Sequence, residues 1–465
     1  MRKGLWGSIG VLLTSASFTF AQSPFFPQGG TAEFDDVPVA ALNSEDEEPD
    51  DDTNLSVELL DLPKTAAEKD EDNQTPATPF TLDANNIPTC DNCIFCVRCC
   101  PKPPRFWGGA DYLLWWYKPG PVTLPLVTTG TLDSFGLLGR PGTEVLFGGS
   151  HLNYDTTSGF RATAGAWLDR CAKVGVETSG FVLEDRGIFF RANGDAAGNP
   201  VLTRPAFNVL DGAAAGALIS FPDAFAGGVA VSSRSQLWGI ETNGVINLCR
   251  KPKLTWDLLV GFRYLDLDES LHIEDSSRIL ADGIAGFNGV PVTAGVIGTQ
   301  DRFDARSQFY GGQIGNRFSF FLNDWLQLSW YNKVALGGTH QSVNAFGTTA
   351  LTLPDGQTGV LPGALLTASS NIGRRTADQF AVVPEVGVNV NVRFCRWASA
   401  SMGYSFLYWN NVVRPGAQID PFVNPNLIPT ALSFGAPGGP ARPAPRMESS
   451  DFWAHGLNCG LRLSY

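Results

Sequence analysis

Trp107–Tyr117 reads WGGADYLLWWY, and its residue pattern decides the fold of the chain. Two kinds of side chain alternate along it, with Gly109 and Asp111 on one face and Ala110, Tyr112, Leu114 and Trp116 on the other. A period of two residues is typical of a β-strand whose faces meet different surroundings. We therefore expect this segment to be the first strand of a barrel.

The last ten residues, GLNCGLRLSY, show the same alternation at the other end of the chain. One face carries Leu457, Cys459, Leu461, Leu463 and Tyr465, and the other carries Asn458, Gly460, Arg462 and Ser464. Pairing between the first and last strands would close the sheet into a barrel.

Composition and the N-terminus indicate an exported β-protein. The 465 residues include 51 Gly, 31 Phe and 12 Trp, and only 17% are charged, which favours one large β-structure. Arg2 and Lys3 precede a short apolar run that ends in Thr19-Phe20-Ala21, the pattern of a secretory signal peptide cleaved after Ala21. No later stretch is long and apolar enough for a spanning helix, so the alternating strands favour a barrel.

The net charge of −13 comes from one segment of the chain. Residues 33–72 contain 16 acidic residues and two lysines, whereas the remainder has 30 acidic and 31 basic residues. Little apolar surface accompanies these acids, so residues 22–89 are expected to be a disordered periplasmic segment. We interpret it as a solvated spacer, with a cation-binding or wall-binding arm as the alternative. The nearly neutral body gives no indication of nucleic-acid binding.

Residues 90–105 form a Cys-rich segment, in which Cys90–Pro101 reads CDNCIFCVRCCP. The spacing matches a bacterial ferredoxin pattern, but the sequence has no second run and an exported chain reaches an oxidising compartment. Disulfides are the favoured interpretation, a zinc-type thiolate site is the next, and no cofactor is predicted.

Ten strands are predicted, joined alternately by short turns and long loops. They cover residues 107–117, 159–168, 173–183, 237–248, 254–265, 308–321, 326–336, 380–394, 398–409 and 452–465. An even strand count with short periplasmic turns and long outer loops is typical of bacterial outer-membrane barrels, and it places both termini on the periplasmic side. A twelve-strand alternative adds residues 143–154 and 341–352.

Strand 380–394 shows the two environments most clearly, because apolar residues alternate with polar ones along it. We expect lipid outside and a polar lumen inside, although a soluble sandwich would produce the same alternation. Tryptophans at the strand ends favour the membrane, since they would form a belt at each interface. One belt contains Trp107, Trp167, Trp256, Trp325 and Trp397, and the other contains Trp115, Trp116, Trp238, Trp409 and Trp453.

Charged residues at inward positions define a candidate site in the lumen. They are Arg161, Lys173, Glu177, Glu241, Arg263, Lys333, Glu385, Arg393 and Arg462. Both signs are present, so we expect Glu177, Glu241 and Glu385 to pair with Arg263, Arg393 and Arg462, because an unpaired buried charge is costly. Barrels of about eight strands are filled by side chains, whereas roughly 16 to 18 strands enclose an aqueous channel. Ten strands therefore favour a structural plug or a narrow channel over a general porin.

The same topology places eight cysteines at one mouth of the barrel, as disulfide or metal-ligand candidates. They are Cys90, Cys93, Cys96, Cys99, Cys100, Cys171, Cys249 and Cys395. Their connectivity and any bound metal stay open. Cys459 is expected to face lipid and to remain unpaired.

Catalytic residues are not predicted. Three histidines, His151, His272 and His340, fall near the outer loops, with Glu274, Asp275, Asp301 and Asp304 as candidate partners. No spacing among them marks a nucleophile or a chelating pair. Solvated charge is also a simpler interpretation of Asp266, Asp268 and Glu269 than a divalent-cation site, because the loop lacks the EF-hand pattern.

Five motifs within residues 106–465 resemble the putative beta-barrel porin family number seven of Gram-negative-type outer membranes. They are FWGGADYLLWWYKPGPVTLPLVTTG, GFRATAGAWLD, WDLLVGFRYLDLDESLHI, FYGGQIG and GYSFLYWNNVVRPGAQID. The C-terminus resembles a barrel-assembly signal, carried by Asn458, Gly460, Leu463 and Tyr465. The resemblance implies an outer-membrane barrel with porin-like function, and it does not extend to the acidic segment or the Cys run.

The sequence thus predicts an outer-membrane β-barrel, either structural or a narrow channel for porin-like passive transport, that is not an enzyme. A surface-interaction or adhesion barrel and a rim-located hydrolase are the alternatives. The expected partners are outer-membrane lipid, the barrel-assembly machinery and small solutes or ions. The sequence gives neither a solute nor an oligomeric state.

Overall fold

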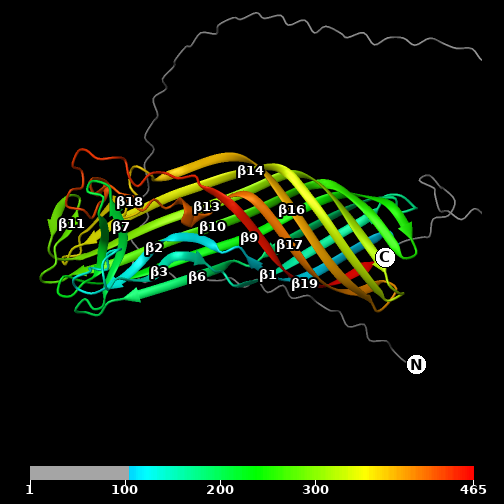
Figure 1. The fold of residues 1–465 in the computed structure, drawn as a ribbon, viewed down its shortest axis with the longest axis horizontal. Helices are drawn as coiled ribbons and strands as arrows, with labels where there is room; N and C mark the ends of the chain where they lie inside the picture. The colour runs from blue at the N-terminus through cyan, green and yellow to red at the C-terminus, as the bar shows by residue number, and fades with distance from the viewer. Residues whose placement is uncertain (1–103) are drawn as a thin grey trace, which may run out of the picture. The chain divides into compact units, whose positions relative to one another are not determined.

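A closed ring of ten antiparallel strands forms the main body of the protein (Figure 1). The computed structural model describes residues 104–465. In order around the ring, the strands are β1 (Phe106–Tyr117), β4 (Thr156–Trp167), β5 (Val174–Leu183), β9 (Phe225–Lys251), β10 (Leu254–Ile279), β13 (Val296–Phe321), β14 (Leu326–Thr352), β16 (Gly373–Arg393), β17 (Ala398–Val413) and β19 (Ser449–Ser464). The predictions for the signal peptide, the acidic segment and the Cys run lie outside the described residues.

Pairing of the first and last strands closes the ring. β1 and β19 run antiparallel from Trp107 opposite Ser464 to Tyr117 opposite Ala454. This confirms the predicted all-β, antiparallel, up-and-down barrel of ten strands. The twelve-strand alternative is wrong, because residues 341–352 continue β14 and β3 (Glu144–Leu152) belongs to a separate sheet.

Four neighbouring strands are much longer than predicted. β9, β10, β13 and β14 contain 27, 26, 26 and 27 residues, whereas a tilted strand needs only about 9–11 residues to cross a bilayer. Beyond residue 265 the outward side chains of β10 become polar, so the lipid-based pattern ends there. Backbone pairing with β9 and β13 nevertheless continues to the end of the strand.

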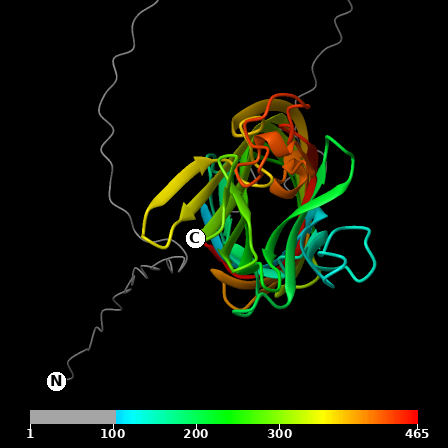
Figure 2. The ribbon, with the colours of Figure 1, turned by 90° about the vertical axis from the view of Figure 1, so that its left-hand side faces the viewer.

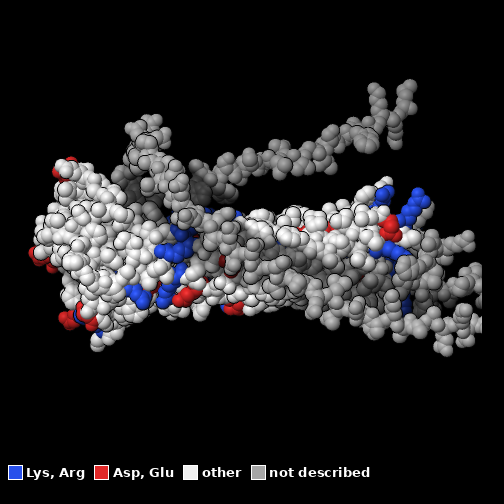
Figure 3. Space-filling view, turned by 90° about the horizontal axis from the view of Figure 1, so that it is seen from above, with Lys and Arg blue, Asp and Glu red and all other residues white. Residues whose placement is uncertain are grey.

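The outer surface of the barrel carries an apolar band. On β10 the outward residues from Trp256 to Tyr264 are apolar or aromatic, with Val260 and Phe262 about half exposed. The next outward residues, Asp266 and Asp268, are acidic. A ring of exposed valines and aromatics on a closed barrel is the surface that faces lipid in transmembrane barrels. In Figure 3, Lys and Arg gather at two levels of the visible wall, near the two ends of the barrel.

The long links fold into a cap at one end, which we call the long-loop end (Figure 2). A second sheet contains β2 (Gly120–Gly130), β3, β7 (Val201–Asn208), β8 (Ala214–Ser220) and β18 (Phe422–Val423). The other cap strands are β6 (Arg186–Asn193), β11 (Ala285–Phe287), β12 (Val290–Val292) and β15 (Thr358–Pro362), and two 3-10 turns are η1 (Pro415–Gln418) and η2 (Pro425–Leu427). We use "cap" for these elements together with the links that join them, and "short-turn end" for the opposite end, where tight turns join the strands.

Helices contribute little to the described part of the chain. Within residues 104–465, none has the length and apolar character needed to cross a membrane.

One hydrophobic core extends from inside the barrel into the cap. Trp115, Leu265 and Phe309 face the lumen, and they belong to the same buried cluster as Leu126 and Ile428 of the cap. Links predicted only as loops therefore contain strands that are part of the core. These links are rich in Gly and Pro, which are typical of loops, so their composition did not indicate strands.

The tryptophan belts form only in part. Trp116, Trp238 and Trp256 lie on outward positions, and Trp325 and Trp397 are exposed at the short-turn end. Trp115 and Trp409 instead point into the lumen and are fully buried. Trp107 and Trp167 also lie on inward positions, with ring centroids 5.0 Å apart. These four tryptophans lie near strand ends, as predicted, but on inward positions rather than at the lipid-facing surface.

Candidate site in the barrel lumen

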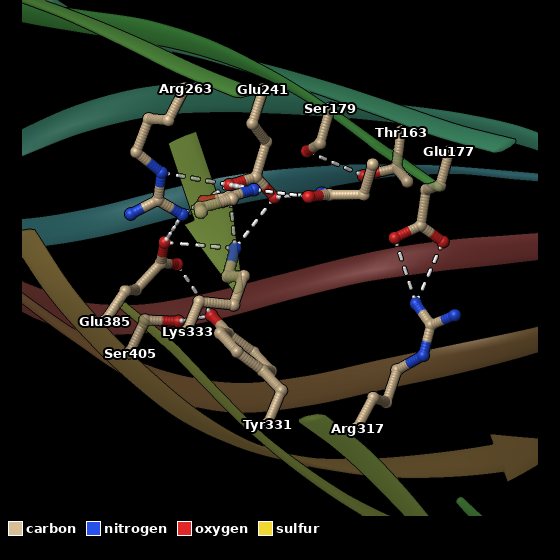
Figure 4. Close-up of polar contacts among 12 residues, drawn as sticks. Thr163, Glu177, Ser179, Glu241, Arg263, Arg317, Tyr331, Lys333, Glu385 and Ser405 are labelled. Atoms are coloured by element: carbon tan, nitrogen blue, oxygen red, sulfur yellow. Dashed lines mark hydrogen bonds and ion pairs between the residues drawn. The ribbon is translucent and has the colours of Figure 1, made fainter. Parts of the chain in front are cut away.

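Five charged side chains meet in the lumen, and we call them the central charge cluster. Figure 4 shows Glu241, Arg263, Lys333 and Glu385 pointing toward one another. They are Arg161 of β4, Glu241 of β9, Arg263 of β10, Lys333 of β14 and Glu385 of β16. Each lies on an inward position of its strand, so the two-residue period directs all five toward the barrel axis. The structure thus brings together five of the predicted lumen charges.

Direct ion pairs connect the cluster. Arg263 lies between Glu241 and Glu385 and donates to both, with Nε 3.1 Å from Glu241 Oε2. Lys333 Nζ is 2.7 Å from Glu241 Oε1 and 3.1 Å from Glu385 Oε2. Arg161 Nη2 is 3.7 Å from Glu385 Oε1. Because these groups are buried, each charge depends on its partners in place of water.

Hydrogen bonds extend the cluster across the lumen. Tyr331 donates to Glu385 over 3.0 Å and lies 2.9 Å from Ser405 Oγ. Asn458 donates to Ser405 over 2.6 Å and accepts from Trp115 Nε1 over 2.8 Å. With Gln313 of β13 donating to Glu241 over 3.3 Å, nine of the ten ring strands take part. The network therefore ties opposite walls of the barrel together.

An apolar layer covers the cluster on the side of the cap. Arg161 lies 5.4 Å from the ring centroid of Trp115 and 5.6 Å from that of Phe181, in cation–π geometry. Leu265 and Leu407 are also buried in this core. A packed hydrophobic core therefore lies beyond the charges, on the side of the cap.

A second group of ion pairs lies nearer the short-turn end. Arg317 Nη1 is 2.9 Å from Glu177, its Nε is 3.3 Å from Asp257, and Trp107 donates to Glu177 over 2.7 Å. Arg462 pairs with Asp111 over 3.0 Å. Sequence reasoning omitted Arg317, Asp257 and Asp111 from the site. All three occupy alternate positions of predicted strands that face the lumen. The two-residue period of those strands therefore predicts their inward direction.

Two of the predicted lumen charges, Arg393 and Lys173, lie outside both groups of ion pairs. Arg393, at the end of β16, is exposed at the short-turn end and forms no ion pair with a described residue. Lys173 lies in the turn before β5, where its backbone N donates to Asp169 Oδ1 over 2.8 Å. The predicted pairing holds for Glu241 and Glu385 with Arg263, whereas Glu177 uses Arg317 and Arg462 uses Asp111.

A cavity of about 420 Å³ lies between the central charge cluster and the short-turn end of the barrel, and it opens at the short-turn end. Charged residues of both groups line it, together with Trp107, Tyr331, Asn389 and Asn391. We call it the vestibule. A second, much smaller space of about 10 Å³ lies among the cluster residues, beside Phe181 and Leu265.

Two buried groups of charges attach the cap to the barrel. Arg414, which follows β17, pairs with Glu269 of β10, and both are almost fully buried. Arg204 of β7 donates to Asp275 over 2.7 Å and pairs with Asp301 over 2.5 Å. Burial raises the pKa of Asp275, and Arg204 opposes that rise. These contacts make the cap continuous with the barrel wall.

The rim residues considered for catalysis or metal binding do not converge. Asp275 and Asp301 bind Arg204 rather than a histidine, His272 lies 3.9 Å from Asp304, and His340 pairs with Asp378 over 2.8 Å. His151 is exposed on β3, and Glu274 is on an outward position of β10. Asp266 and Asp268 face outward while Glu269 faces Arg414. Within residues 104–465, no group of three or more His, Cys, Asp or Glu has metal-binding geometry.

The cysteine pairing stays a prediction. Cys90, Cys93, Cys96, Cys99 and Cys100 lie outside the described residues, and Cys171 follows β4 in the first short turn. Cys249 and Cys395 are free thiols at the short-turn end, and Cys459 is a free thiol on the outer face of β19.

A ten-stranded outer-membrane-type barrel with buried ion pairs in its lumen is the class of protein that this fold and site define. Residues 107–465 match the family model for putative beta barrel porin-7. The chain belongs to this family, as the five motifs indicated. No curated protein matches the chain.

Solved structures of outer-membrane barrels are similar only in general fold. The outer membrane protease OmpT from Escherichia coli is 9% identical, with a TM-score of 0.32 and coverage of 78% of this chain and 97% of OmpT. A Pseudomonas aeruginosa FadL homologue is 8% identical, with a TM-score of 0.21 and coverage of 78% and 90%. The P. putida toluene transporter TodX is 8% identical, with a TM-score of 0.19 and coverage of 79% and 91%. Such low scores give no argument for protease or transport activity here.

Proposed function

We propose that this protein is a closed outer-membrane barrel that anchors a folded cap at the cell surface and does not serve as an open diffusion pore. The observation that carries the proposal is the filled lumen. The central charge cluster joins opposite walls, and a hydrophobic core continues from it into the cap. A water-filled porin would need a continuous polar passage, which requires many more strands than ten.

The proposal assigns an interaction role to the cap and no catalytic role to the rim. Large apolar side chains such as Leu132, Val290 and Leu432 are exposed on the cap. Exposed apolar residues beside a rigid framework are a feature of interaction surfaces. Outer-membrane lipid would contact the apolar band, and the barrel-assembly machinery would recognise the last strand.

Conductance measurements test the closed lumen directly. Refolded protein in planar bilayers is expected to give no steady single-channel current, and vesicles that contain it should exclude sugars as well as empty vesicles do. An unrelated open porin in the same bilayers serves as the control. Large, steady currents with free passage of sugars would overturn the proposal and favour passive transport.

Thiol labelling tests the orientation that the proposal requires. Leu432→Cys places a thiol on an exposed cap position, and a membrane-impermeant maleimide should label it in intact cells. The unmodified protein, whose described free thiols at the short-turn end are Cys249 and Cys395, should be labelled only after lysis. Labelling of the unmodified protein in intact cells, with protection of Leu432→Cys, would reverse the topology.

A further inference from the structure

The vestibule has an uneven distribution of charge. Deep in the barrel five cations (Arg161, Arg263, Arg317, Lys333 and Arg462) face five acids (Asp111, Glu177, Glu241, Asp257 and Glu385) in direct contacts. The deeper charges therefore neutralise one another.

The rim of the vestibule, at the short-turn end of the barrel, carries a net positive charge because arginines outnumber acids there. Arg250, Arg393 and Arg396 line it, and Asp324 is the one acid that lines this rim among the described residues. Arg250 is held in place by Trp167, 5.2 Å from its ring centroid, and by the carbonyl of Ala172, 3.2 Å from Nη2. The backbone N of Arg393 donates to the carbonyl of Trp325 over 2.7 Å, whereas the guanidinium groups of Arg393 and Arg396 contact no acid among residues 104–465. Both arginines are exposed and line the cavity.

Size and lining also suit a bound molecule. A cavity of about 420 Å³ falls within the range of small-molecule sites, roughly 300–1,000 Å³. Amide groups of Gln327, Asn389 and Asn391 line the wall beyond the arginines. A positive rim above a narrow, low-dielectric cleft concentrates anions, and the planar guanidinium group matches carboxylate and phosphate oxygens.

We propose that the vestibule is a binding site for a small anionic molecule bearing carboxylate or phosphate groups, which enters from the short-turn end and is held by Arg393 and Arg396. Arg250 would complete the positive rim, and the amides beyond it would bind uncharged oxygens of the same ligand. The site is closed at its inner end by the central charge cluster. Binding there does not depend on whether the lumen conducts.

Calorimetric titration of the refolded full chain with citrate, and separately with inorganic phosphate, tests the site. We expect saturable binding of at least one anion, weakened about tenfold or more in an Arg393→Gln/Arg396→Gln variant, because charge-assisted hydrogen bonds are lost. The matched control is Lys251→Gln/Lys253→Gln. It removes the same charge from a neighbouring turn outside the lining, and it should change affinity less than about twofold, as expected for exposed charges.

Two outcomes would overturn the site. Equal weakening in both double variants would mean that diffuse surface charge attracts the anions, and absence of saturable binding to the unmodified protein would mean that the vestibule takes no such ligand. Retention of the compact, heat-modifiable form on gels verifies that each variant is folded, which the exposed positions of these side chains favour. Glucose, which has no charge, should bind much more weakly than citrate.

Discussion

Replacing Glu385 with alanine is expected to destabilise the barrel by about 3–5 kcal/mol. Glu385 is 3% exposed and contacts Arg161, Arg263, Lys333 and Tyr331. Without it, Arg263 and Lys333 share Glu241, and Arg161 loses its ion pair with Glu385. Urea unfolding of the protein in phospholipid vesicles, followed by tryptophan fluorescence, measures the loss. Conductance of the same variant should rise if water from the vestibule replaces the missing carboxylate.

Two further variants identify the cause of that loss. Glu385→Gln preserves the volume of the side chain but removes its charge, so most of the destabilisation should remain if electrostatics are responsible. Asp378→Ala changes an exposed carboxylate on the same strand, paired with His340, and should cost less than about 1 kcal/mol. A wild-type-like Glu385→Ala barrel, or equal losses in Glu385→Ala and Asp378→Ala, would show that the central charge cluster is not coupled to stability.

Replacing Arg204 with methionine is expected to release the cap while leaving the barrel folded. Asp275 and Asp301 would then share a buried site without a cation, a loss of about 3–5 kcal/mol in cap docking. Limited proteolysis of intact vesicles should cut the cap links of Arg204→Met and leave the ring strands protected. Arg140→Met is the matched control, because Arg140 is an exposed cap residue whose guanidinium donates to the carbonyl of Asp133 and lies 5.9 Å from the ring centroid of Phe135, with no carboxylate partner among the described residues.

The defect of Arg204→Met should also depend on pH. Burial raises the pKa of Asp275 even when Arg204 opposes the rise, so loss of Arg204 should raise that pKa further. A carboxyl with a raised folded-state pKa contributes its full stability below its unfolded pKa and loses it as the pH rises through the folded pKa. The difference from the wild type, measured by urea unfolding, should therefore shrink as the pH falls into the acidic range. A difference that grows on acidification would contradict this assignment.

Much of the barrel could be predicted because contact with lipid requires apolar residues at every second position of each spanning strand. Outward residues such as Val386, Val388 and Val390 had to be apolar, and a strand has a period of two. Ten strands, their order and the inward direction of Glu241, Arg263 and Glu385 all follow from these two facts. The same two-residue period also directs Arg317 and Asp257 into the lumen, so both can be predicted from the sequence as lumen charges.

Other features of the molecule leave no such pattern. Beyond Leu265 the outward residues of β10 are polar, while Leu267, Leu271 and Ile273 still face inward, so this part of the strand lacks the apolar outer face that lipid imposes. Strands of the cap, such as β7, pack against segments that are distant in sequence, and their burial comes from the complete fold. The tight packing of Trp115 and Trp409 inside the lumen likewise depends on barrel closure.

By itself, then, the sequence determined an all-β barrel of ten strands with charges of both signs in its lumen. Local alternation carries that information, because each strand must match lipid on one face wherever it lies in the chain. Only the tertiary structure decided which charges pair, where the lumen closes and how the cap docks. Arg204 and Asp301, or Glu269 and Arg414, meet across long sequence separations, and only closure of the ring and folding of the long links bring such partners into contact.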